Sequence, residues 1–142
     1  MKIIISGRGG QGIKLISTIL AKSSIENNKF VTLTASYGPE ARGGFSQCSI
    51  VIDDKIITNP IVKKADYLLA FSKEAVEMWG PKAKTVIYHD NIHNMEMLGI
   101  FIKTIGEDIE PIIETMRHEI SAKYTDRIDA NIFNIRKGYD LI

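Results

Sequence analysis

Residues 2–21 read KIIISGRGGQGIKLISTILA, in which an apolar strand, a glycine-rich turn and an amphipathic helix follow one another directly. The strand is predicted over residues 2–6 because β-branched isoleucines favour extended backbone. The helix is predicted over residues 13–27 because its apolar residues recur at helical spacing. A glycine-rich turn that joins a strand to a helix is the setting in which protein backbones bind phosphate groups. The stretch therefore predicts a Rossmann-like α/β fold with an anion site at the start of the helix.

The residues of the glycine turn have separate expected roles. Gly7 allows a tight turn, Gly9 lets a phosphate approach the backbone, and Gly12 lets the helix pack closely against the strand. Amides at the helix start attract an anion, and the guanidinium of Arg8 adds a permanent cation. The predicted cofactor-binding residues here are Gly7, Arg8, Gly9, Gly10, Gln11 and Gly12. The alternative is a tight strand-to-helix connection that binds nothing.

An NAD site needs one more feature, an acidic residue about 20 positions further on that holds a ribose hydroxyl. The corresponding residues 34–36 are Thr, Ala and Ser, and the nearest acid, Glu26, lies inside the predicted helix. An ordinary NAD dehydrogenase is therefore disfavoured. A different phosphate-bearing ligand, or the surface of another subunit, remains compatible with the turn.

A second glycine-rich loop, SYGPEARGG, occupies residues 36–44. In a parallel sheet such a loop emerges at the carboxyl ends of the strands, beside the first turn. Glu40 and Arg42 then either orient a polar ligand or contact a partner chain. The alternative is a solvated surface ion pair worth under about 1 kcal/mol. The predicted cofactor-binding residues in this loop are Tyr37, Gly38, Glu40, Arg42 and Gly43.

Short β-branched runs alternate with helix-like stretches up to residue 90, which indicates an α/β layer structure with a mostly parallel sheet. Further strands are predicted over residues 30–34, 45–52, 55–58, 67–71 and 85–88. Asp53 and Asp54 are typical of a tight turn, so residues 45–52 and 55–58 are expected to form a β-hairpin.

The remaining elements are helical. Ser72 is expected to cap a short helix that ends at Gly80 and Pro81. From residue 91 onward apolar residues recur at helical spacing, which predicts a helical C-terminal tail. With no low-complexity linker between these parts, residues 1–142 are expected to form a single domain.

Composition limits the function classes. The chain of 142 residues has 18 basic and 17 acidic residues, and the basic residues are scattered along the sequence, so no nucleic-acid partner is expected. Apolar runs are far shorter than the roughly 20 residues that cross a bilayer, and no secretory signal is present, so the expected location is the cytoplasm. A single cysteine, Cys48, is interpreted as a small buried apolar residue. No third ligand accompanies His89 and His93, so no metal site is predicted.

Two motifs in register, GRGGQG at residues 7–12 and SYGPEARGG at residues 36–44, are followed by the strand SQCSIVI at residues 46–52. Together they resemble the gamma subunits of pyruvate, 2-oxoglutarate and ketoisovalerate:ferredoxin oxidoreductases. The resemblance covers residues 1 to about 90 and returns at NMEMLG, residues 94–99, which is similar to the segment that opens the family's terminal helices. Family members carry a further segment before that helix, which is reduced here to residues 90–93.

The resemblance implies a complex that oxidatively decarboxylates a 2-oxoacid, transfers the acyl group to coenzyme A and reduces ferredoxin. Thiamine diphosphate and [4Fe-4S] clusters would belong to partner subunits, namely alpha, beta and a ferredoxin-like delta subunit. This chain would carry no catalytic residue and would help to bind coenzyme A, and its second loop is most similar to the 2-oxoglutarate type. The alternatives are a structural subunit with no ligand of its own and a free-standing nucleotide-binding protein.

Overall fold

The computed structural model describes residues 1–37, 45–89, 91–120 and 126–142. These residues divide into two compact units, Met1–Asn91 and Ile92–Ile142, here called unit 1 and unit 2. The single domain expected from the sequence stays a prediction. Unit 1 contains β1 (Lys2–Arg8), α1 (Ile13–Glu26), β2 (Phe30–Tyr37), β3 (Phe45–Asp53), β4 (Ala65–Ala70), α2 (Lys73–Trp79), the 3₁₀ turn η1 (Gly80–Lys82) and β5 (Ala83–Tyr88).

The sheet of unit 1 has the strand order β2-β3-β1-β4-β5 within the described residues. β1, β4 and β5 pair in parallel, whereas β3 pairs antiparallel with both β1 and β2. Four strands therefore point the same way and one strand runs against them. The predicted α/β fold with a mostly parallel sheet is confirmed, with β3 as the exception. The ends of β1, β2, β4 and β5 form what we call the carboxyl edge of the sheet, and their beginnings form the amino edge.

The predicted hairpin between residues 45–52 and 55–58 is wrong. Residues 55–58 form no strand. Both hydrogen-bonding edges of β3 are already occupied, because residues 46–53 pair with β2 and residues 45–51 pair with β1. A further strand after Asp53 has no free edge of β3 to pair with. β3 instead pairs antiparallel with β1 and β2, both of which precede it in the chain.

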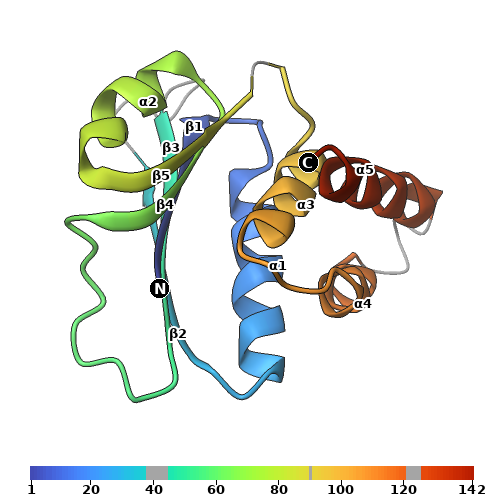
Figure 1. Cartoon of the computed structure of the whole chain (residues 1–142), viewed down its shortest axis with the longest axis horizontal. Coiled ribbons are helices and arrows are strands. Elements are labelled where there is room, and N and C mark those ends of the chain that lie inside the picture. The colour runs from blue at the N-terminus through green and yellow to red at the C-terminus, as the bar shows by residue number, and fades with distance from the viewer. Residues whose placement is uncertain (38–44, 90, 121–125) are drawn as a thin grey trace. The chain divides into compact units, whose positions relative to one another are not determined.

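Helices cover both faces of this sheet, with α1 on one side and α2 on the other (Figure 1). Both faces of β1 are therefore buried, and the consecutive residues Ile3, Ile4 and Ile5 are all fully buried. This explains why the strand is a continuous apolar run and does not alternate with polar residues. On the α2 side a core cluster joins Ile4, Val51, Val62, Ala65, Leu68, Ala70 and Ala75. Cys48 is buried, as its alternation on β3 predicts.

The neighbouring strands β1 and β4 send the chain to opposite faces of the sheet. β1 continues into α1 on one face, and β4 continues into α2 on the other (Figure 1). In open α/β sheets this reversal leaves a crevice at the carboxyl ends of the two strands, where ligands bind. The glycine turn after β1 lies at this point.

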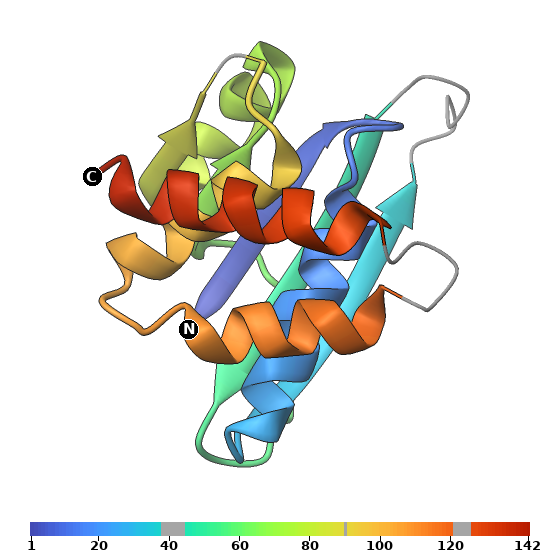
Figure 2. The same cartoon turned by 90° about the vertical axis from the view of Figure 1, so that its right-hand side faces the viewer.

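Unit 2 consists of α3 (Asn94–Thr104), α4 (Glu110–Glu119) and α5 (Ile128–Asp140). Figure 2 shows α4 and α5 running side by side. α3 and α5 pack backbone against backbone, because a Cβ on Gly99 would lie 2.7 Å from Tyr139 N and a Cβ on Gly138 would meet the backbone of Glu96. The predicted helical tail is confirmed. Among the described residues, no helix is long and apolar enough to cross a membrane.

Candidate functional site

The glycine turn depends on backbone conformations that favour glycine. Gly10 has φ of 86° and Gly12 has φ of 74°, both in the left-handed region. A Cβ on Gly7 would lie 2.8 Å from the Cβ of Phe71 and would also meet the side-chain oxygen of Gln11. Glycine is therefore needed at position 7 because Phe71 and Gln11 pack directly against the backbone there. It is favoured at positions 10 and 12 because the backbone takes left-handed φ values there. Among the described residues, nothing beyond its chain neighbours lies within 4 Å of a Cβ built on Gly10.

Gln11 braces the turn from inside. Its Oε1 accepts a hydrogen bond from the Arg8 backbone N–H at 2.6 Å, and its Nε2 donates to the Phe71 carbonyl at 3.1 Å. Its own backbone N–H donates to the Arg8 carbonyl at 3.4 Å. Two of these bonds close the turn on itself, and the third ties it to Phe71, the residue that follows β4, so the turn is shaped before any ligand arrives. The sequence indicated an amide donor at Gln11 and did not reveal the bracing side chain.

Within the described residues, no side chain caps the start of α1 with a hydrogen bond, and the first turn of the helix contains no acidic residue. Its first intrahelical bond runs from the Ile16 N–H to the Gly12 carbonyl at 3.3 Å. The first amides of an α-helix have no partner within the helix, and the positive end of the helix dipole lies with them. Together with the exposed Lys14 in that first turn, this end of α1 attracts an anion.

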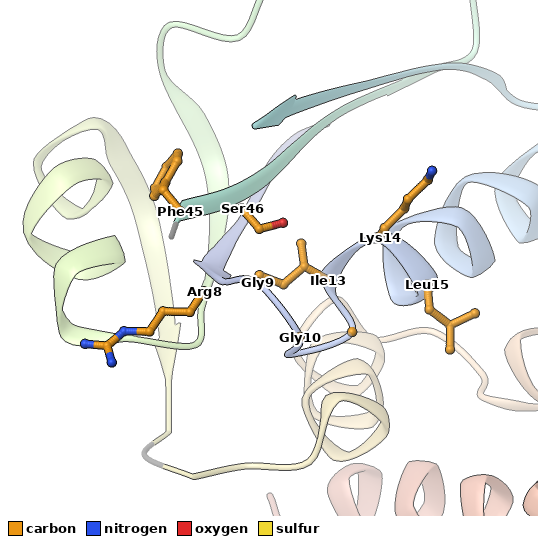
Figure 3. Close-up of a pocket in the computed structure, with 9 residues that line it drawn as sticks. Arg8, Gly9, Gly10, Ile13, Lys14, Leu15, Phe45 and Ser46 are labelled. Atoms are coloured by element: carbon orange, nitrogen blue, oxygen red, sulfur yellow. The ribbon is translucent and has the colours of Figure 1, made fainter. Parts of the chain in front are cut away.

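A hollow of about 380 Å³ opens beside this helix start (Figure 3). It is lined by Arg8, Gly9, Gly10, Gly12, Ile13, Lys14, Leu15, Phe45 and Ser46, and we call it the turn hollow. Lys14 supplies an ammonium group and Ser46 supplies a hydroxyl. Ser46 could not be placed from the sequence, because it reaches the site only through the pairing of β3 with β1. Lys14 could have been recognised from the sequence, because it lies two residues after the last glycine of the turn and so falls in the first turn of the predicted helix.

Arg8 does not direct its charge into the turn hollow. Its side chain points away from Gly10 and Lys14 (Figure 3). The guanidinium instead forms an ion pair with Glu74 at 2.6 Å, in which the two side chains are 62% and 58% exposed. The backbone N–H of Glu74 itself and the Arg8 guanidinium hold the pKa of this carboxyl below its ordinary value. The carboxylate of Glu74 therefore stays charged and competes with any anion for Arg8.

A second hollow of about 370 Å³ lies on the α2 side of Arg8. Its lining is mainly polar and consists of Arg8, Gln11, Phe71, Ser72, Lys73, Glu74, Tyr88 and Asn91. Ser72 caps α2 as predicted, by accepting a hydrogen bond from the Ala75 N–H at 3.2 Å. Arg8 thus lines two cavities of similar size.

The two predicted loops share the carboxyl edge as far as the structure describes them. The backbone of Tyr37, the last residue of β2, pairs with Ser46, and Phe45 pairs with Arg8. Gly38, Glu40, Arg42 and Gly43 lie outside the described residues. Their assignment to a binding site stays a prediction.

A polar network lies beneath the site on the α2 side of the sheet. The Trp79 Nε1 donates to the Gln47 Oε1 at 2.7 Å, which connects α2 to β3. Gln47 stands opposite Ser6 in the sheet. Ser6 is fully buried and its hydroxyl has no hydrogen-bond partner among the described residues. This part of the molecule supports the site and offers no reactive group to it.

His93 stands at the start of α3, where its Nδ1 accepts from the Met95 N–H at 3.1 Å, and His89 is exposed. The described residues contain no cluster of three or more His, Cys, Asp or Glu side chains that could hold a metal ion.

Comparisons with known proteins agree with this geometry. The model of the family "Pyruvate ferredoxin/flavodoxin oxidoreductase" matches residues 2–90. The 2-oxoglutarate synthase subunit KorC of Archaeoglobus fulgidus is 37% identical over 97 residues, which cover 66% of this chain and 52% of that protein. The KorC subunit of Methanocaldococcus jannaschii is 44% identical over 55% of this chain and 42% of its own length. The matches to these curated relatives thus span about half of their length.

Solved structures share the fold over nearly the whole chain. The gamma subunit of a keto/oxoacid ferredoxin oxidoreductase from Geobacter sulfurreducens superposes with a TM-score of 0.75 at 22% identity, over 98% of this chain and 96% of that one. The 2-oxoglutarate:ferredoxin oxidoreductase from Magnetococcus marinus gives a TM-score of 0.79 at 15% identity, over 99% of this chain and 30% of that one. The chain therefore belongs to the pyruvate ferredoxin/flavodoxin oxidoreductase family, and its fold is that of the family's gamma subunits.

Proposed function

We propose that this chain acts as the gamma subunit of a 2-oxoacid:ferredoxin oxidoreductase of the 2-oxoglutarate type and helps to bind coenzyme A. Support for the 2-oxoglutarate type comes from the KorC relatives, which are 37% and 44% identical over their matched segments. A pyruvate synthase subunit PorC of Methanothermobacter thermautotrophicus is 27% identical over a longer segment, 82% of this chain and 71% of that protein. The substrate is therefore part of the proposal and needs its own test.

One observation carries the coenzyme A role, namely the uncapped start of α1 behind an open glycine turn. The turn hollow of about 380 Å³ accommodates a phosphate group and its neighbouring atoms, and the rest of coenzyme A would extend along the carboxyl edge. Gly10 lets the phosphate approach the backbone, while Lys14 and the α1 amides balance its charge. The solved relative from Magnetococcus marinus holds coenzyme A together with 2-oxoglutarate and succinyl-CoA.

In this proposal the chain binds and orients, and the reaction takes place on neighbouring chains. Coenzyme A supplies the thiol that accepts the acyl group. Thiamine diphosphate and the [4Fe-4S] clusters would be held by the alpha, beta and ferredoxin-like delta subunits, which pass electrons to ferredoxin. A cluster normally needs four thiolates, and this chain has one cysteine, which is buried.

The test is reconstitution of the complex. The chain is co-expressed with its alpha, beta and delta partners, and reduction of an electron acceptor is measured with 2-oxoglutarate, pyruvate and 2-oxoisovalerate, each with and without coenzyme A. We expect activity that requires this chain and coenzyme A and has its highest kcat/KM for 2-oxoglutarate. Undiminished activity without the chain would contradict the proposal, and a higher kcat/KM for pyruvate would overturn the substrate assignment alone.

A second candidate is a structural subunit whose glycine turn contacts a partner chain and binds no ligand. The engagement of Arg8 by Glu74, away from the turn hollow, favours this candidate. Calorimetry of the assembled complex with coenzyme A separates the two. Equal coenzyme A affinity in the wild type and in Arg8→Ala and Lys14→Ala variants would support the structural role.

A further inference from the structure

The amino edge of the sheet in unit 1, opposite the glycine turn, carries a concentration of lysines. β1, β4 and β5 are parallel, so their first residues meet at this edge. A hollow of about 550 Å³ opens there, and four lysines and one aspartate contribute to its lining. We call it the lysine hollow, with Lys2, Lys64, Lys82, Lys84 and Asp66 as its charged residues.

The fold creates this charge from residues that are scattered in the sequence. Four lysines and one aspartate give the hollow a formal charge of +3, whereas the whole chain carries +1. All four lysines are exposed. The excess positive charge of the chain is thus gathered at one place, and the rest of the molecule is slightly acidic. Such a local field attracts an anionic partner and falls off over about 10 Å at 0.1 M salt.

Asp66 organises the hollow and does not simply cancel its charge. One carboxylate oxygen accepts from the Lys2 backbone N–H at 2.8 Å, and the other pairs with the Lys84 ammonium at 3.1 Å. The Lys2 N–H and then Lys84 hold the pKa of Asp66 below its ordinary value, so it stays ionised. Both oxygens already serve this chain, and Lys84 is fixed in position by one of them.

The other lysines remain available to a partner. The ammonium of Lys82 lies 5.1 Å from the ring centre of Trp79, a cation–π contact that orients it. In the part of the chain that the structure describes, the ammonium groups of Lys2 and Lys64 form no ion pair. Lys82 and Lys84 thus each contact another residue of this chain, and all four lysines line the same hollow.

The chemistry of the hollow selects among anions. Its cations are all lysines, which lack the forked donors with which arginine grips phosphate. Lys82 lies over one face of the Trp79 ring, and Trp79 also packs against the core cluster, so the ring offers little surface on which a base could stack. Several separate point charges around a wide opening suit several separate carboxylates on one extended segment. We propose that the lysine hollow binds an acidic, carboxylate-rich segment of a partner polypeptide.

This site is independent of the proposed coenzyme A role. The lysine hollow lies at the amino edge and the turn hollow at the carboxyl edge, and they share no lining residue. A partner can therefore dock at one edge without covering the other. Failure of coenzyme A binding would leave this inference untouched, and its own failure would leave the coenzyme A proposal untouched.

The experiment uses the full chain and a fluorescein-labelled octaglutamate peptide. Binding is followed by fluorescence anisotropy, and the contact is mapped by amide shifts in NMR spectra. We expect the shifts to concentrate at residues 64–66 and 82–84. The double variant Lys64→Glu/Lys82→Glu should weaken binding about tenfold or more, and added salt should weaken binding to the wild type.

The matched control is Lys22→Glu/Lys103→Glu, which changes the net charge equally but lies outside the lysine hollow. It should keep the peptide affinity within about twofold. Circular dichroism checks that both variants fold, and the single variant Lys64→Gln, with an expected loss of about threefold, serves if the double variant does not.

Three results would overturn the inference. Equal loss in both double variants would mean general attraction to a charged protein. Displacement of the peptide by tripolyphosphate at equal charge concentration would mean a small-anion site. Tighter binding of an eight-residue oligothymidylate than of octaglutamate would mean a nucleic-acid site.

Discussion

At both ends of the strands in the unit 1 sheet we propose a site for an anionic partner, but the two sites are built differently. At the carboxyl edge the backbone makes the site, through left-handed glycines, the uncapped start of α1 and the brace of Gln11. At the amino edge side chains make the site, through lysines at the starts of three strands. A site made mainly of backbone depends strongly on steric fit, whereas a site made of exposed side chains depends mainly on charge and is screened by salt. Variants can separate these two modes of binding.

The largest expected effect comes from filling the space at Gly7. In Gly7→Ala the new Cβ lies 2.8 Å from Phe71 Cβ and 2.9 Å from Ile13 Cδ1, so the turn or β4 must move. Overpacking of this kind costs about 1–3 kcal/mol. Urea denaturation should show a clear loss in the free energy of unfolding.

Ser6→Ala is the matched control for Gly7→Ala. Ser6 precedes Gly7, and its hydroxyl is buried without a hydrogen-bond partner among the described residues. Removal of this hydroxyl should leave the free energy of unfolding unchanged or raise it. If Gly7→Ala is as stable as the wild type, the close approach at the turn does not constrain the carboxyl edge.

The next effect tests the brace. In Gln11→Glu a carboxylate can still accept from the Arg8 N–H, but it cannot donate to the Phe71 carbonyl, which it now faces. Losing this bond and leaving the carbonyl unpaired should cost about 1–3 kcal/mol at neutral pH. Protonation restores a donor, so the deficit should shrink as the pH falls from neutral toward about 4.3, the pKa of Glu in the unfolded chain.

Denaturation of Gln11→Glu and the wild type across the pH range measures this difference. A deficit that does not depend on pH would contradict the brace as the cause. The lysine hollow should be unaffected, so octaglutamate binding serves as the internal control.

The smallest effect concerns the Arg8–Glu74 pair. Because the pKa of Glu74 is lowered in the folded chain from its ordinary value of 4.5, its contribution to stability is present above that value. This contribution is lost as the pH falls through the folded-state pKa. Both partners are largely exposed, so the contribution is small.

Glu74→Gln removes this pH dependence and releases Arg8 toward the turn hollow. Its stability should fall less than that of the wild type between about pH 5 and pH 3. At neutral pH its affinity for coenzyme A should rise. Weaker coenzyme A binding in Glu74→Gln would show that Glu74 supports the site and does not compete with it.

The contrast between the edges also explains what the sequence could reveal. The glycine turn is contiguous, and the strand before it and the helix after it follow from local periodicity, so β1 and α1 could be predicted, while the anion site stays a prediction. The role of the Gln11 side chain could not, because its partner Phe71 is 60 residues away in the chain.

The hairpin prediction was wrong, and the lysine hollow was missed, because both depend on strand pairing between residues far apart in the chain. The insertion of β3 between β1 and β2 removes the edge that a hairpin with residues 55–58 would need, and nothing local to Asp53 and Asp54 signals this. The lysines of the amino edge are dispersed in the sequence and meet only because three strands begin together. The sequence therefore shows no basic stripe, although the folded chain brings these lysines together.

The most direct test of the coenzyme A site replaces Lys14 by glutamate. An acidic residue in the first turn of α1 favours the helix by about 0.3–1 kcal/mol, so Lys14→Glu should fold normally while it removes the cation of the turn hollow. In the reconstituted complex, KM for coenzyme A should rise about tenfold, which corresponds to about 1.4 kcal/mol, and KM for 2-oxoglutarate should change by less than about twofold. An unchanged KM for coenzyme A, or an equal rise in both constants, would contradict a phosphate site at the glycine turn.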